Sequence, residues 1–179
     1  MRAASPSGAI AARLLSAVAA LVLVAAPQAC DRQDPSATGV ARLGEPLPRI
    51  AGETIEGESF DLASYAEGSP LVINVWAHDC APCRQEQPML VELARRYEGD
   101  VRFVGINYQD DRDAARAWIS RYEVEYPNLY DRRGRSAVDL GYPFIPDTYV
   151  VDREGTMRWV VFGATDEAQL VRLIEDVLA

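Results

Sequence analysis

The sequence contains no lysine: all 18 of its basic side chains are arginine, set against 27 aspartates and glutamates. The net charge of −9 leaves no basic excess to hold nucleic-acid phosphates, so we expect no nucleic-acid partner. Cysteine occurs three times, at positions 30, 80 and 83, which is too few for a disulfide-stapled mini-protein. Hydrophobic residues nevertheless fill 49% of the 179 positions, enough for one compact domain.

A long hydrophobic run is also missing. The longest, residues 14–26 (LLSAVAALVLVAA), has Arg2 and Arg13 before it and small residues after it. A helix of 13 residues spans about 20 Å, short of the roughly 30 Å of a hydrocarbon core. We therefore expect residues 1–29 to be a signal peptide, with a short buried helix as the alternative.

The segment after this run indicates a tether. Ala29 and Cys30 resemble the end of a bacterial lipoprotein signal, in which the cysteine carries the lipid, although Pro27 departs from that pattern. Ordinary cleavage, leaving Cys30 as a free thiol, is the alternative. Residues 30–42 are polar and contain proline and glycine, which predicts a flexible tether. We expect the protein outside the cytoplasm, in the periplasm or anchored to the outer face of the membrane, where disulfides can form.

Residues 43–179 show the alternating pattern of one α/β domain. Residues 71–77 are almost continuously apolar, as in a strand buried on both faces, and residues 82–97 then change to helical spacing. A hairpin is expected near 49–60. Further strands are expected at 101–108, 147–152 and 156–163, helices at 112–122 and 166–178, and a shorter strand and helix within 128–140. This order predicts a mixed central sheet with helices on both faces.

The paired cysteines lie where the first of these helices should begin. In Cys80-Ala81-Pro82-Cys83, Pro82 suits a first helical turn because it lacks an N–H. Unpaired N–H groups at a helix N-terminus stabilise an anion, so Cys80 should form a thiolate more readily than a free cysteine. Cys83 can reach back to close a small disulfide, which predicts thiol–disulfide exchange without a metal or other cofactor.

Three other interpretations of the cysteine pair remain. A zinc site would need two further ligands, for which only His78 and Cys30 are candidates. A structural disulfide without turnover would stabilise little, because the loop is so small. A copper chaperone could bind Cu(I) through the two thiolates and His78.

Two segments together resemble a known family. The first is residues 76–88 (WAHDCAPCRQEQP), and the second is Ile145-Pro146 followed by Thr148. Both are similar to active-site segments of the thioredoxin superfamily, in particular of its membrane-tethered TlpA/ResA/DsbE-type redoxins. The resemblance implies a thioredoxin-like fold over 43–179, with that group's insertion at 126–142. Peroxiredoxins share the fold, but their proline and threonine upstream of the reactive cysteine are missing here.

The resemblance implies roles for individual residues. Cys80 would attack, Cys83 would resolve, and Glu86 would relay protons near the cysteines, unless it is a solvated glutamate on the helix face. Asn74 stands where cytoplasmic thioredoxins carry a buried aspartate. Pro146 would be cis, exposing the backbone of Ile145 for a client segment to pair with; a trans loop proline is the alternative.

The resemblance also implies supporting residues and partners. Trp76 would pack beneath the site, and Pro82 would support the helix start. His78 and Asp79 depart from the family pattern: a protonated His78 would favour the Cys80 thiolate and Asp79 would oppose it, but a solvated loop residue without a role is our expectation for His78.

The function expected is that of an extracytoplasmic protein-disulfide oxidoreductase. We expect it to act as a monomer and as a reductant of cysteine-containing client proteins, for example in cytochrome c maturation, with a membrane or extracytoplasmic thiol as electron partner. A disulfide-donating oxidant of the same fold is the alternative. Glu86 and Asp79 favour the reductant because both oppose thiolate formation.

Overall fold

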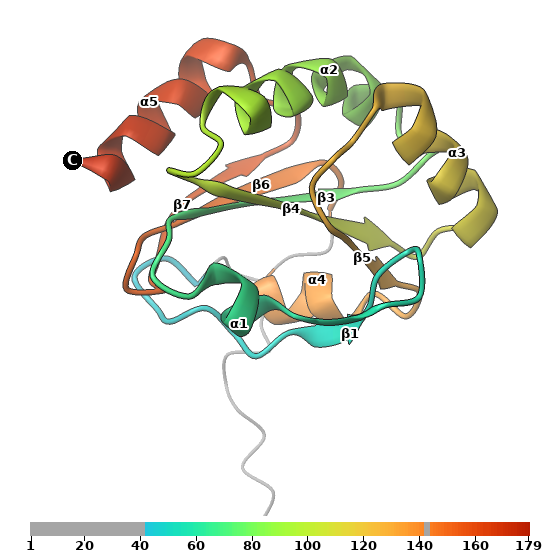
Figure 1. Cartoon of the computed structure of the whole chain (residues 1–179), viewed down its shortest axis with the longest axis horizontal. Coiled ribbons are helices and arrows are strands. Elements are labelled where there is room, and N and C mark those ends of the chain that lie inside the picture. Colours follow the sequence, from blue (N-terminus) through green and yellow to red (C-terminus); the bar gives the residue numbers. More distant parts are fainter. Residues whose placement is uncertain (1–41, 142–143) are drawn as a thin grey trace, which may run out of the picture. The chain divides into compact units, whose positions relative to one another are not determined.

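The computed structural model describes residues 42–141 and 144–179 (Figure 1). The predicted signal peptide (1–29), Cys30 and all of the predicted tether except Arg42 lie outside the described residues. None of the helices within the described ranges is long and apolar enough to cross a membrane.

A mixed five-stranded sheet in the order β5-β4-β3-β6-β7 forms the centre of the domain. Its strands are β3 (Leu71–Trp76), β4 (Arg102–Tyr108), β5 (Asn128–Asp131), β6 (Asp147–Val151) and β7 (Met157–Phe162). The first three run parallel, while β6 is antiparallel to β3 and β7 is antiparallel to β6. The helices are α1 (Leu62–Ala66), α2 (Ala81–Arg96), α3 (Arg112–Tyr122), α4 (Arg135–Leu140) and α5 (Glu167–Leu178).

Helices cover both faces of the sheet, as the apolar run of β3 predicts. In Figure 1, α2, α3 and α5 lie above the sheet, and α1 and α4 lie below it. Successive side chains of a strand point to opposite faces, so Ile73 packs in the core with α1 and α4, and Val72 packs with Leu90 of α2 and Leu170 of α5. Every residue of β3 is buried. This confirms the thioredoxin-like α/β architecture and places the end of β3 in the interior.

The predicted N-terminal hairpin and the predicted insertion meet at one side of the sheet. The hairpin pairs β1 (Ala51–Glu53) with β2 (Ser59–Asp61) and reaches the edge strand β5, where Thr54 bridges Leu129 and the Ile55 N–H donates to the Asn128 carbonyl at 2.9 Å. The insertion at 126–142 supplies β5 and α4. Together they carry Ile55 and Asn128 to the end of β3, next to the cysteine pair.

Candidate active site

Cys80 and Cys83 are joined by a disulfide at the start of α2. Cys80 is the N-cap residue of this helix, and its Sγ accepts the Cys83 backbone N–H at 3.2 Å. A turn that is closed by the Cys80 N–H and the Ala77 carbonyl, 3.3 Å apart, leads from β3 into the helix. Cys80 is 8% exposed and Cys83 only 1%, so Cys80 is the more accessible residue of the pair.

Aromatic rings support the disulfide from within the domain. Trp76, Trp118 and Ile55 form one buried cluster with both cysteines, and the two indole rings stack with centroids 5.0 Å apart. Trp76 Nε1 donates to Asn128 Oδ1 at 2.9 Å, which fixes the ring against the insertion. Trp76 therefore packs beside the disulfide, and Pro82 lies in the first turn of α2.

The Ile145–Pro146 peptide bond is cis. Ile145 is half-buried and packs against the cluster that contains the cysteines, which brings this loop and the disulfide together across the fold. The Pro146 carbonyl accepts the Gly163 N–H at 2.8 Å. The cis geometry agrees with expectation, whereas client binding at Ile145 and Pro146 stays a prediction.

Glu86 lies one helical turn beyond Cys83 and is only 3% exposed. Its two carboxylate oxygens accept from Asn74 Nδ2 at 2.9 Å and from the Thr165 N–H at 3.0 Å. Asn74 Nδ2 also donates to Thr148 Oγ1 at 3.1 Å. Burial raises the pKa of Glu86, and the hydrogen bonds from Thr165 and Asn74 oppose that rise without cancelling it. The alternative of a solvated helix-face glutamate is therefore wrong.

A second buried carboxylate, Asp147, was missed by the sequence reasoning. It follows the cis proline, is 0% exposed, and pairs with Val75 at the end of β3. Its Oδ1 receives only a long contact from the Gly163 N–H at 3.4 Å, and Oδ2 has no hydrogen-bond partner among the described residues. Burial raises the pKa of Asp147 to about 7, and the charge of Glu86 adds to the rise. The sequence signal that could have identified Asp147 is its position directly after Pro146, the proline predicted to be cis.

His78 is a partly solvated loop residue, as we expected, but its side chain has a buried partner. Its ring Nδ1 contacts the carboxylate of Asp110, which lies in the loop between β4 and α3. The two residues are 32 positions apart, and the sequence gives no spacing rule that would pair them. Asp79, by contrast, is exposed.

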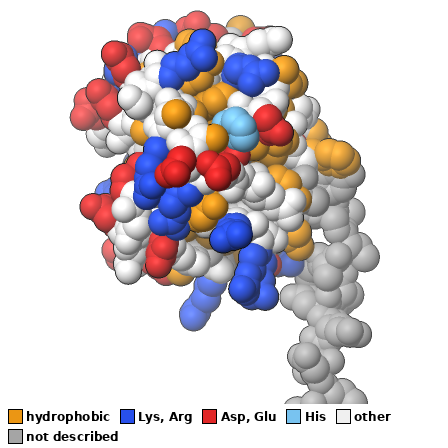
Figure 2. Space-filling view, turned by 90° about the vertical axis from the view of Figure 1, so that its right-hand side faces the viewer, with side chains coloured by type: hydrophobic (Ala, Val, Ile, Leu, Met, Phe, Trp, Pro, Cys, Tyr) orange, Lys and Arg blue, Asp and Glu red, His pale blue; other side chains and the backbone are white. Residues whose placement is uncertain are grey.

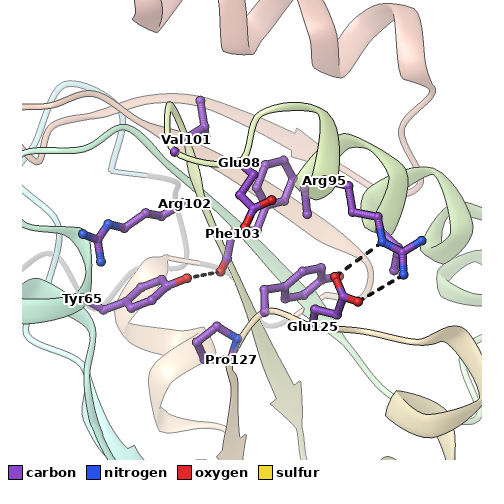
Figure 3. Close-up of a pocket in the computed structure, with 12 residues that line it drawn as sticks. Tyr65, Arg95, Glu98, Val101, Arg102, Phe103, Glu125 and Pro127 are labelled. Carbon is purple, nitrogen blue, oxygen red and sulfur yellow. Dashed lines mark hydrogen bonds and ion pairs between the residues drawn. The ribbon is translucent and has the colours of Figure 1, made fainter.

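A separate cavity of about 230 Å³ lies far from the disulfide along α2 (Figure 3). Its lining comes from the last turns of α2, the residues that lead into β4, Tyr65 of α1 and residues 125–127 before β5. There the Tyr65 hydroxyl donates to the Phe103 carbonyl at 3.0 Å and Arg95 pairs with Glu125. It contains neither cysteine nor histidine, so the candidate active site remains at the N-terminus of α2.

Comparisons with known proteins show the family to which this chain belongs. The AhpC/TSA family model matches residues 43–160. The thiol:disulfide interchange protein DsbE of Yersinia pestis is 37% identical over 130 residues, covering 71% of this chain and 68% of that protein. DsbE of Escherichia coli K12 is 32% identical over 146 residues, covering 80% and 77%.

The solved structures point the same way. The crystal structure of a secreted Mycobacterium tuberculosis disulfide oxidoreductase, homologous to E. coli DsbE, superposes with a TM-score of 0.66. It is 26% identical to this chain, and the match covers 72% of this chain and 96% of that one. The chain therefore belongs to the AhpC/TSA family, in which its relatives at 32–37% identity are DsbE thiol:disulfide interchange proteins.

Proposed function

We propose that this protein is a thiol–disulfide oxidoreductase that acts on cysteine-containing client proteins, with Cys80 as the attacking thiol and Cys83 as the resolving thiol. One observation carries the assignment: Cys80 Sγ caps α2 and accepts the N–H of Cys83. A sulfur in that position is stabilised as a thiolate by the helix N-terminus, and thiolate is the form that attacks a disulfide. Because Cys83 is almost fully buried, it can react with Cys80 but hardly with a client.

The direction we propose is reduction of the client. Glu86, one turn after Cys83, and Asp147, next to the cis proline, are both buried carboxyl groups, and a negative charge on either disfavours a thiolate nearby. A less stable thiolate makes the reduced protein less stable and lowers its redox potential, which suits a reductant. The names of the DsbE relatives support an interchange role without fixing its direction.

We propose that the domain acts outside the cytoplasm and is held to the membrane through a lipid on Cys30. A thiol partner at the membrane would reduce its Cys80–Cys83 disulfide after each reaction. The apolar run at 14–26, the cysteine after it and the polar segment 31–42 support this arrangement. A secreted relative of known structure also supports it. Mass spectrometry of the purified full chain tests the anchor, because a diacylglycerol on Cys30 changes the mass of the N-terminal peptide.

Insulin reduction and a redox titration test the function. The wild-type protein should accelerate insulin reduction, Cys80→Ser should abolish the acceleration, and Cys83→Ser should trap clients as mixed disulfides on Cys80. Equilibration with glutathione or dithiothreitol buffers should give a potential well below that of the strong oxidant DsbA. A value near about −120 mV would refute the reductant assignment, and activity retained in Cys80→Ser would refute the function itself.

A further inference from the structure

Four N–H groups surround the carboxylate of Asp110, next to the loop that leads from β3 to Cys80. Its Oδ2 accepts the His78 backbone N–H and Asn107 Nδ2, each at 2.7 Å. Its Oδ1 accepts the Asp111 N–H at 2.7 Å and contacts Nδ1 of the His78 ring. The Asp110 side chain is 2% exposed and that of His78 is 42% exposed. A buried anion therefore holds a histidine that remains open to solvent.

These contacts fix which ring nitrogen can react. Burial raises the pKa of Asp110, but the hydrogen bonds from Asn107 and from the His78 backbone and ring outweigh it, so the pKa lies below its ordinary value. An ionised carboxylate has no proton to give, so Nδ1 of His78 must be the donor of their contact. In the neutral ring Nε2, which has no partner among the described residues, is then the nitrogen with the free lone pair.

His78 lies two residues before Cys80, on the loop that leads from β3 into α2. His78 lines a cavity of about 300 Å³ together with Arg84 and Trp118, and Trp118 also packs in the cluster that contains Cys80. The Ala77–Cys80 turn keeps the two residues close along the chain. Figure 2 shows the histidine, coloured pale blue, at the surface among acidic and apolar side chains.

Charged groups from each neighbouring element surround His78. Asp79 adjoins it on the turn, and Asp110 anchors it from the loop after β4. From α2, Arg84 Nη1 donates to the His78 carbonyl at 3.0 Å, and from α3, Arg121 and Tyr122 line the far side of the cavity.

We propose that His78 is the proton carrier for the first half of disulfide exchange, oriented by Asp110 as a positioning residue. The proposal rests on the proposed function and adds the group that accepts the proton of Cys80. A carboxylate that fixes the tautomer of a histidine beside a nucleophile is a general arrangement for base catalysis.

The exchange balances as follows. Cys80 of the reduced protein passes its thiol proton to Nε2 and attacks one sulfur of the client disulfide. The client S–S bond breaks, the Cys80–client S–S bond forms, and the leaving client sulfur takes the proton back from Nε2. Cys83 then attacks Cys80 Sγ, and its proton goes to the second client sulfur. The client gains two electrons and two protons, and the protein is left with the Cys80–Cys83 disulfide.

His78→Asn is the informative variant, because its side-chain amide can still donate to Asp110 but offers no second nitrogen. The reduced protein is mixed with a peptide that contains one alkyl disulfide, and the rate is followed by tryptophan fluorescence from pH 5 to 9. We expect a rate about 100-fold lower near pH 7, the low end for general acid–base catalysis, with an unchanged melting temperature. His78→Ala should be slow as well and should recover part of its rate when imidazole is added.

A matched control variant distinguishes the role of Asp110 in orienting His78 from a general effect of removing a negative charge. Asp110→Asn should slow the reaction, whereas Asp113→Asn, which removes an exposed carboxylate from the same helix end, should not. A wild-type rate and pH profile in His78→Asn, or no imidazole recovery in a folded His78→Ala, would overturn the inference. If the wild-type protein itself fails to reduce the peptide, the proposed function is wrong. If the wild type and the His78 variants all reduce it at equal rates, the proposed function stands and the role of His78 is wrong.

Discussion

Replacing Asp147 by asparagine should remove most of the pH dependence of stability that this site imposes. In the folded protein the carboxylate is fully buried, and one of its oxygens has no hydrogen-bond partner among the described residues. Its pKa is raised by burial from 3.8 to about 7. Asparagine has nearly the same shape, can keep an oxygen facing the Gly163 N–H, and carries no charge at any pH.

The sign and the size follow from proton linkage. Between about pH 4 and pH 7 the folded protein binds the Asp147 proton more tightly than the unfolded chain does, so its free energy of unfolding falls as the pH rises and levels off above about 7. Three units at about 1.4 kcal/mol each give roughly 4 kcal/mol. For a domain of this size that is on the order of 10 °C in melting temperature.

Urea unfolding of the oxidised protein from pH 4 to 8.5 measures the difference directly. Wild type and Asp147→Asn should be about equally stable near pH 4, and the variant should be more stable by a few kcal/mol at pH 8. Asp139→Asn, which removes an exposed carboxylate from α4, should track the wild type. Parallel curves for wild type and Asp147→Asn over the whole range would refute the idea that this buried charge is costly.

Two further outcomes depend on the same site. Gly105→Ala should lower the free energy of unfolding in urea by about 1–3 kcal/mol. The added Cβ would lie 1.9 Å from Asn128 Oδ1 and 2.7 Å from Trp76 Nε1, so it would break the hydrogen bond between these two side chains. An unchanged urea midpoint would contradict this. Glu86→Gln should raise the redox potential, because it removes a buried negative charge near the cysteines. Each tenfold change in the exchange equilibrium corresponds to about 30 mV. An unchanged or lower potential in the glutathione titration would contradict this.

The central part of the fold could be predicted because its signals are local. The apolar run of β3 and the helical spacing after it place Cys80 and Cys83 at a strand–helix junction without any tertiary information. The insertion was placed by resemblance, but its four-residue strand is too short to reveal by its sequence pattern that it forms the edge of the sheet beside β4.

The polar part of the site could not be predicted in the same way. The family resemblance placed Glu86 near the cysteines, but its burial depends on Thr165, which lies 79 positions away and contacts it from the loop before α5. The pairing of His78 with Asp110 likewise depends on parallel β3 and β4 ending side by side. For Asp147, the sequence shows a charged residue, while only the packing shows that one of its carboxylate oxygens lacks a hydrogen-bond partner among the described residues.

The arrangement of these groups suggests that the two cysteines do not share one proton carrier. Glu86 lies one turn after Cys83 on α2 and is closed off from solvent by Asn74 and Thr165, so a proton there can serve the buried sulfur. His78 lies before Cys80 and lines a cavity of about 300 Å³, and its side chain is 42% exposed, so it can serve the sulfur that meets the client. Under the proposed mechanism, loss of His78 then slows formation of the mixed disulfide, and loss of Glu86 slows its resolution. The two steps can be separated because Cys83→Ser stops the reaction after the first.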